Sequence, residues 1–257
     1  MLAYKLFNNP KEPWLVFLHG FLGIKENWIP FVKEFKEFCC CCIDLPGHGE
    51  SHSVSLSFDD TLNEIKKIIK KPSTFIAYSM GGRLALAFTL AYPEYVTRLF
   101  LESASPGLGK KYDRTIRRME DKKKAKEILN TSLNEFLKEW YKQDLFSSLR
   151  KHPALENHIQ QCLYNTPEGL ARSLQTLGTG SQRSYWEDLK SCQPLVHLIV
   201  GDQDDKFMSI AARMQEENEA FSLHIIPSSG HNAHLENPAI FGEILKKNIT
   251  GVSDDLE

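Results

Sequence analysis

A serine, an aspartate and a histidine stand in the chain in an order that could support nucleophilic catalysis. Ser79 lies in FIAYSMGGR, where an apolar stretch predicts a strand that turns sharply into a helix. Asp204 lies in GDQDDKF, and His231 follows a glycine in SSGHNAHLENP. A serine hydroxyl becomes reactive when an imidazole accepts its proton, and a carboxylate fixes the tautomer of that imidazole. We therefore predict that these three residues form a catalytic triad.

Other acids and imidazoles compete for these roles. The competitors are Asp202, Asp205, His19, His48 and His234. Either neighbouring aspartate could be the acid, although Asp202 lies closest to the predicted strand end and is expected to brace the loop. His234, near the start of the last predicted helix, is expected to cap or pack. The remaining two histidines lie in turn sequences, HGF and PGHG, where a structural hydrogen bond is expected.

The turn around Ser79 departs from the pattern Gly-x-Ser-x-Gly at one position. Ala77 replaces the first glycine, whereas Gly81 keeps the second. One extra methyl group needs only a slightly wider approach of strand and helix, so Ser79 remains the expected nucleophile. Two backbone N–H groups, those of Phe21 in LHGFLG and Met80, are predicted to form an oxyanion hole.

The elements that must position these residues read as an α/β architecture. Short apolar runs predict strands at Trp14–Leu18, Cys39–Ile43, Thr74–Ala77, Arg98–Glu102, Val196–Val200 and Ser222–Ile226. Amphipathic stretches predict helices at Trp28–Phe35, Phe58–Ile69, Gly81–Ala91, Met208–Glu217 and Phe241–Ile249. Buried strands that alternate with helices predict a mostly parallel sheet with helices on both faces.

The middle of the chain has a different character. Residues 107–182 are rich in charged, helix-like stretches and contain no convincing strand. We predict a helical cap over the carboxyl ends of the strands, inserted into a core formed by residues 1–106 and 183–257. The lysine-rich run KKKAK, residues 122–126, is expected to be a solvated helix face.

The composition narrows the possible partners. The 257 residues carry a formal net charge of −2, which argues against binding to nucleic acid or to an anionic membrane. No stretch approaches 18 uninterrupted apolar residues, the N-terminus does not resemble a signal peptide, and a cytoplasmic location is expected.

The run Cys39–Cys42 fits a buried strand, because alternating side chains cannot converge on one metal ion. The sequence does not decide between a monomer and a homo-oligomer.

Several motifs together resemble a known superfamily. LHGF, DLPGHGES, the S-M-G-G turn, the late G-D-x-D loop and G-H are similar to those of the α/β hydrolases over nearly the whole chain. Five blocks resemble more narrowly the 2-succinyl-6-hydroxy-2,4-cyclohexadiene-1-carboxylate synthase family of menaquinone biosynthesis. These blocks are YSMGGRLAL, ESASPGL, GTGSQRSYW, GDQDDKF and SGHNAHLENP.

That resemblance implies a lyase. In this family the triad drives proton abstraction next to a ketone, and the enolpyruvyl group leaves as pyruvate without a metal or a cofactor. The implied substrate is a small polycarboxylate, 2-succinyl-5-enolpyruvyl-6-hydroxy-3-cyclohexene-1-carboxylate. Arg83 lies one helical turn after Ser79, where its guanidinium could bind a carboxylate, although an ion pair with a protein acid would be the ordinary role. The resemblance implies substrate contacts for Arg117, Trp140 and Tyr78 as well.

One position departs from the family. A late cap arginine in an E-R-L-x-N stretch corresponds here to Cys162 in QCLYN. Losing such a contact should cost about 1.5–3 kcal/mol of binding. Either Arg172 or Arg183 is expected to compensate, or the substrate differs. A serine carboxylesterase or thioesterase that acts on an anionic acyl substrate is therefore the alternative function.

Overall fold

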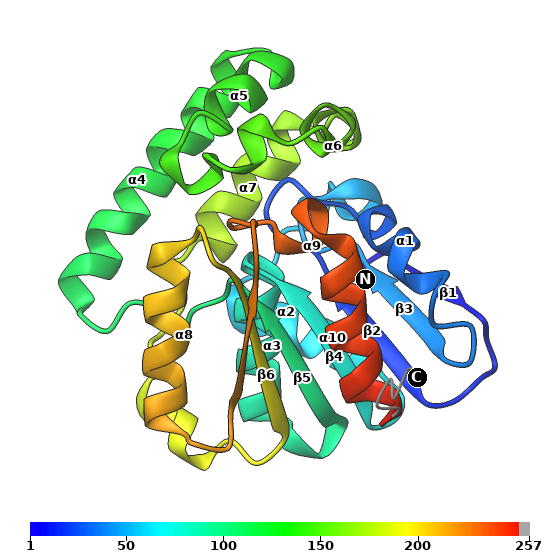
Figure 1. The fold of residues 1–257 in the computed structure, drawn as a ribbon. Coiled ribbons are helices and arrows are strands. Elements are labelled where there is room, and N and C mark those ends of the chain that lie inside the picture. The colour runs from blue at the N-terminus through cyan, green and yellow to red at the C-terminus, as the bar shows by residue number, and fades with distance from the viewer. Residues whose placement is uncertain (252–257) are drawn as a thin grey trace.

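The computed structural model describes residues 1–251 and contains one seven-stranded sheet in this range (Figure 1). The strands are β1 Tyr4–Phe7, β2 Trp14–Leu18, β3 Cys39–Ile43, β4 Ser73–Tyr78, β5 Val96–Glu102, β6 Leu195–Gly201 and β7 Ser222–Ile226. All six predicted strands are present, with small shifts at their ends. The sequence analysis missed β1, because this antiparallel edge strand is short, partly exposed and contains Lys5 in place of a continuous apolar run.

The strand order is β1-β3-β2-β4-β5-β6-β7, and every pair except β1–β3 is parallel. In chain order, β3 pairs with one side of β2, and β4 then pairs with the other side of β2. The carboxyl ends of β2 and β4 therefore flank the point where the strand order reverses, which is where open α/β sheets bind ligands. The predicted fold class, a mostly parallel sheet with flanking helices, is confirmed.

Helices cover both faces of the sheet. Those outside the middle segment are α1 Ile29–Val32, α2 Phe58–Ile68, α3 Met80–Ala91, α8 Asp205–Glu217, α9 Ala233–Glu236 and α10 Pro238–Thr250. The apolar side chains of α2, α3 and α8 pack into one buried cluster, and those of α1 and α10 pack into another on the opposite face. Burying both faces explains why the central strands are continuous apolar runs.

The cysteine run shows this alternation directly. Cys39 and Cys41 belong to the first cluster, and Cys40 and Cys42 belong to the second. Their side chains leave β3 on opposite faces, as the period of a strand requires. Burial raises the pKa of Cys40 to about 12, so this thiol is protonated at neutral pH and behaves as a small apolar group.

The predicted helix Trp28–Phe35 is wrong in length and type. The structure has a 3₁₀-helix, η1 Lys25–Trp28, followed by the single-turn α1. After Val32 the hydrogen bonds span three residues instead of the four of an α-helix, as when the Glu34 N–H donates to Phe31 O over 2.9 Å. Pro30 fits the first turn of α1, where no intrahelical donor is needed.

Four helices from the middle of the chain lie above the carboxyl edge of the sheet (Figure 1). They are α4 Lys111–Asn130, α5 Leu133–Trp140, α6 Ala154–Cys162 and α7 Pro167–Leu177. Here they are called the cap helices. Ser132 caps α5 and Thr166 caps α7 through side-chain acceptors, and the helices share a third apolar cluster. The division into a core and a 107–182 cap domain stays a prediction. Within residues 1–251 no helix is long and apolar enough to cross a membrane.

Candidate active site

Ser79 lies in a strained turn between β4 and α3. Its φ is 49° and its ψ is −106°, a conformation that non-glycine residues rarely adopt. The helix that follows lies very close to the end of β2, because a Cβ added at Gly81 would come within 2.5 Å of His19 O. Glycine is therefore required at that position, whereas the methyl group of Ala77 is accommodated in the first apolar cluster. The geometry is that of a nucleophile elbow.

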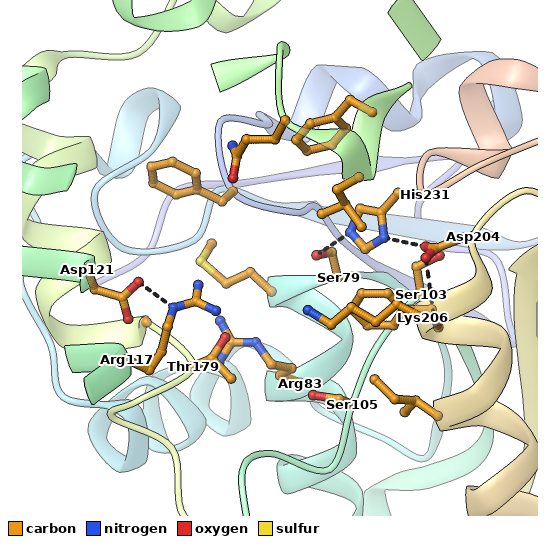
Figure 2. Close-up of a pocket in the computed structure, with 18 of the residues that line it drawn as sticks. Ser79, Arg83, Ser103, Ser105, Arg117, Asp121, Thr179, Asp204, Lys206 and His231 are labelled. Atoms are coloured by element: carbon orange, nitrogen blue, oxygen red, sulfur yellow. Dashed lines mark hydrogen bonds and ion pairs between the residues drawn. The ribbon is translucent and has the colours of Figure 1, made fainter. Parts of the chain in front are cut away.

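The three predicted triad side chains meet at the carboxyl edge of the sheet. Ser79 Oγ lies 3.1 Å from His231 Nε2, and His231 Nδ1 lies 2.8 Å from Asp204 Oδ2 (Figure 2). Asp204 is also the N-cap of α8, where its other oxygen accepts the Phe207 N–H over 3.2 Å. The imidazole is thus held between an acceptor for its Nδ1–H and the hydroxyl whose proton it can accept.

The structure distinguishes Asp204 from the two neighbouring aspartates by their contacts. Asp202 accepts the Ser229 N–H over 3.2 Å and so braces the loop, as expected. Asp205 is exposed at the start of α8. Only the middle aspartate of the three forms a hydrogen bond or ion pair with His231 in the described chain.

Two of the competing histidines, His19 and His48, make buried structural contacts. His19 Nε2 accepts the Leu45 N–H over 3.0 Å, and burial lowers the pKa of His19 to about 4. His48 Nε2 accepts the Leu22 N–H over 3.2 Å, and burial lowers the pKa of His48 to about 3. Both imidazoles are therefore neutral at neutral pH and hold turns.

His234 forms a contact that the sequence analysis missed. Its Nδ1 lies 2.7 Å from Glu102 Oε2, and its backbone N–H donates to Glu102 Oε1 over 2.9 Å. Trp28 stacks on the imidazole, with ring centroids 4.9 Å apart. This buried pair ties the loop that carries His231 to the end of β5. No spacing rule in the sequence links two residues 132 positions apart.

The two predicted oxyanion donors line the same cavity as Ser79. Met80 is the first residue of α3, so its N–H has no intrahelical acceptor. The Phe21 N–H, in the turn after β2, donates to no other atom of residues 1–251. An oxyanion bound beside Ser79 would give both donors an acceptor, so this part of the site remains a prediction with compatible geometry.

Arg83 is buried and forms no ion pair with an acid of residues 1–251. It is 8% exposed, and its Nη1 and Nη2 donate to Gln182 Oε1 over 2.9 Å and to Leu177 O over 2.7 Å. Burial and the nearby Arg117 guanidinium lower the pKa of Arg83 to about 10, so it stays charged at neutral pH. The ordinary ion pair considered for this arginine is absent among the described residues.

Arg117 and the two predicted aromatic contacts also line the cavity. Arg117 donates from Nε to Asp121 Oδ1 over 2.8 Å, and its terminal nitrogens donate to no other group in residues 1–251. Trp140 packs against Phe21, with centroids 5.0 Å apart. The buried Tyr78 hydroxyl donates to Asn232 Oδ1, and burial and Glu102 raise the pKa of Tyr78 well above its usual value.

The cavity has a volume of about 1120 Å³ and lies between the sheet edge and the cap helices. Its lining includes basic residues that the sequence analysis did not single out: Lys123, Lys124, Lys206 and Arg213. Lys122, Lys123 and Lys126 are exposed and Lys124 is half-buried, so the run is a solvated helix face as expected, and two of its lysines also line the cavity. Helical spacing alone could not show that α4 lies over the active-site edge.

Cys162 does not line this cavity. It lies in the apolar cluster of the cap helices, with Sγ 3.7 Å from both Tyr141 Oη and His158 Nε2. The arginines proposed as replacements are also outside the cavity lining: Arg172 donates to His52 O, and Arg183 pairs with Asp188. The compensation expected from these two is not supported. The basic residues that do line the cavity are matched in number by acidic ones: Glu120, Asp121, Glu127, Asp144, Asp204 and Asp205.

Comparison with known proteins shows the family to which the chain belongs. A sequence model of the α/β hydrolase fold matches residues 13–238, so the chain belongs to the α/β-hydrolase fold family. The structure of MenH from S. aureus superposes with a TM-score of 0.92 at 30% identity, covering 98% of this chain and 99% of that one.

Named relatives narrow the assignment. The 2-succinyl-6-hydroxy-2,4-cyclohexadiene-1-carboxylate synthase of Escherichia coli (strain K12 / DH10B) is 31% identical over 240 residues, which cover 90% of this chain and 91% of that protein. The chain belongs to the family of these synthases. Protein PHYLLO, chloroplastic, of Arabidopsis thaliana is 33% identical over 261 residues, and the chain spans only 15% of that longer protein.

Proposed function

We propose that this protein is a 2-succinyl-6-hydroxy-2,4-cyclohexadiene-1-carboxylate synthase that eliminates pyruvate from 2-succinyl-5-enolpyruvyl-6-hydroxy-3-cyclohexene-1-carboxylate. The family supplies the reaction, and the contacts around Ser79 support it. Ser79, His231 and Asp204 are the proposed catalytic residues. Arg83, Arg117, Trp140 and Tyr78 are the proposed substrate contacts. The cytoplasmic location expected from the sequence is part of the same proposal.

The proposed chemistry needs one base, one acid and a stabilised oxyanion. His231 Nε2 accepts the Ser79 proton, and the Ser79 oxygen takes the proton from C2, next to the succinyl ketone. The Phe21 and Met80 N–H groups stabilise the enolate oxygen. The electrons form C2=C3, the existing C3=C4 bond shifts to C4=C5, and the C5–O bond breaks. The departing enolate takes the proton from His231 and becomes pyruvate, so the triad returns to its initial state.

The buried Arg83 is the observation that carries this proposal. A charged guanidinium removed from water is costly unless an opposite charge compensates for it. Among residues 1–251 Arg83 donates only to neutral acceptors, and Asp121, the nearby acid, forms its ion pair with Arg117. A bound carboxylate would give Arg83 an anionic partner of its own, and a planar guanidinium can bind it with two parallel hydrogen bonds.

The experiment is incubation of the protein with the enolpyruvyl substrate, followed by measurement of pyruvate through NADH oxidation by lactate dehydrogenase. The Ser79→Ala variant is the control. An activated aryl ester, assayed in parallel, tests the alternative esterase function. Ester turnover well above pyruvate release would favour the esterase and reject the synthase.

A further inference from the structure

Lys206 occupies a position that helix stability does not explain. It is the second residue of α8, and a positive charge in the first turn of a helix opposes the helix dipole. Among residues 1–251 it forms no ion pair, and its Nζ lies 5.5 Å from the centroid of the Phe207 ring. A local choice that disfavours the helix points to a role outside it.

The side chain of Lys206 lines the cavity. Figure 2 shows it extending from α8 into the cavity, toward the side where Ser79, Arg83 and Arg117 lie. It follows Asp204 by two residues, so the loop that supplies the triad acid also sets the position of this ammonium. Lys206 is exposed, whereas Arg83 is buried deep in the cavity.

The substrate proposed above has three carboxylates, one each on the ring, the succinyl group and the enolpyruvyl group. The two guanidinium groups lie together and suit carboxylates that stay on the product. A lysine carries a compact, well-hydrated charge, and on the exposed side of the cavity it suits a group that must depart.

We propose that Lys206 binds the carboxylate of the enolpyruvyl group and stabilises the negative charge that grows on this group as the C5–O bond breaks. This inference rests on the proposed function. The cation transfers no proton and stays charged throughout, so the atoms and electrons balance as in the elimination above. Lys206 then acts on the rate of the elimination as well as on binding.

The test compares Lys206→Met and Lys206→Arg with the unmodified protein in the pyruvate-release assay. Lys126→Met is the matched control, because Lys126 is an exposed lysine of α4 outside the cavity lining. Inhibition by added pyruvate, measured from the initial rate of diene formation by its ultraviolet absorbance, probes the proposed contact directly. Circular dichroism and thermal unfolding show that each variant is folded.

We expect Lys206→Met to lower kcat/KM about tenfold or more, with part of the loss in kcat, and to weaken pyruvate inhibition by a similar factor. Lys206→Arg should recover most of kcat/KM and most of the pyruvate inhibition, and Lys126→Met should change neither quantity. A folded Lys206→Met variant within twofold of the unmodified protein overturns the inference. A lower kcat/KM with unchanged pyruvate inhibition also overturns it, because the lysine would then act elsewhere. If the unmodified protein releases no pyruvate, this result contradicts the proposed function, on which the inference rests.

Discussion

Replacing Arg83 with lysine keeps the charge but removes the planar fork, and so tests how the cavity binds its anion. In the structure the guanidinium donates to both Leu177 O and Gln182 Oε1. A lysine ammonium is a point charge on a shorter stem, and it cannot hold both acceptors while it also binds a carboxylate with two parallel bonds. The perturbation is therefore confined to geometry.

The magnitude follows from the contact that is lost. One charge-assisted hydrogen bond contributes about 1.5–3 kcal/mol, so we expect kcat/KM for pyruvate release to fall roughly 10- to 150-fold. One acceptor left unpaired in the protein costs about 1–3 kcal/mol of folding free energy, which in a chain of this size lowers Tm by several degrees. The fold should survive, as circular dichroism would show.

The matched control is Arg114→Lys. Arg114 also donates to two carbonyl oxygens, those of Leu108 and Gly109, but it does not line the cavity. We expect its kcat/KM to stay within about twofold of the unmodified protein, a range below the smallest loss expected for a substrate contact. If Arg83→Lys were folded and equally active, the assignment of Arg83 as a carboxylate ligand would be refuted.

Three further predictions concern the triad, the elbow and a buried imidazole. Asp204→Asn should keep the Phe207 N–H capped but present the wrong partner to the imidazole, so kcat should fall about 10⁴-fold while thermal unfolding changes little; an active variant would exclude Asp204 as the triad acid. Ala77→Gly should cost about 0.5–1 kcal/mol in urea unfolding through backbone entropy and leave kcat unchanged, and a large gain in kcat would show that the methyl group strains the elbow. Burial lowers the pKa of His19 from 6.5 to about 4, so between these pH values the unfolded chain binds more protons than the folded chain. The neutral imidazole therefore contributes on the order of 3 kcal/mol to the free energy of unfolding above pH 6.5, and this contribution is lost as the pH falls toward 4. Histidine ring NMR should show this imidazole titrating near pH 4, and a midpoint near 6.5 would contradict its burial.

The sheet and the edge that carries the candidate site were predictable because each depends on a local pattern. Continuous apolar runs identify strands buried on both faces, and the turn at Ser79 needs small residues whose spacing is visible in the sequence. Strand order then brings the loops with Asp204 and His231 to one edge. The position of Asp204 in its motif favoured it over Asp202 and Asp205, and the coordinates show that, of these three, Asp204 contacts His231.

Other features depend on contacts that no local pattern encodes. The Glu102–His234 pair joins distant segments, and the exposure of Lys123 and Lys124 to the cavity depends on how α4 is placed over the sheet. The same is true of Cys162, which the resemblance to the family implies at a substrate contact and the structure places in the cap cluster. An edge strand with polar residues, such as β1, gives too weak a periodic signal to be recognised.

Pyruvate release from the enolpyruvyl substrate tests the central claim most directly. The unmodified protein should release pyruvate in step with formation of the cyclohexadiene product, and Ser79→Ala should be slower by about 10²- to 10⁴-fold, the usual contribution of a positioned base. Equal rates for the two proteins, or no pyruvate from either, would contradict the account.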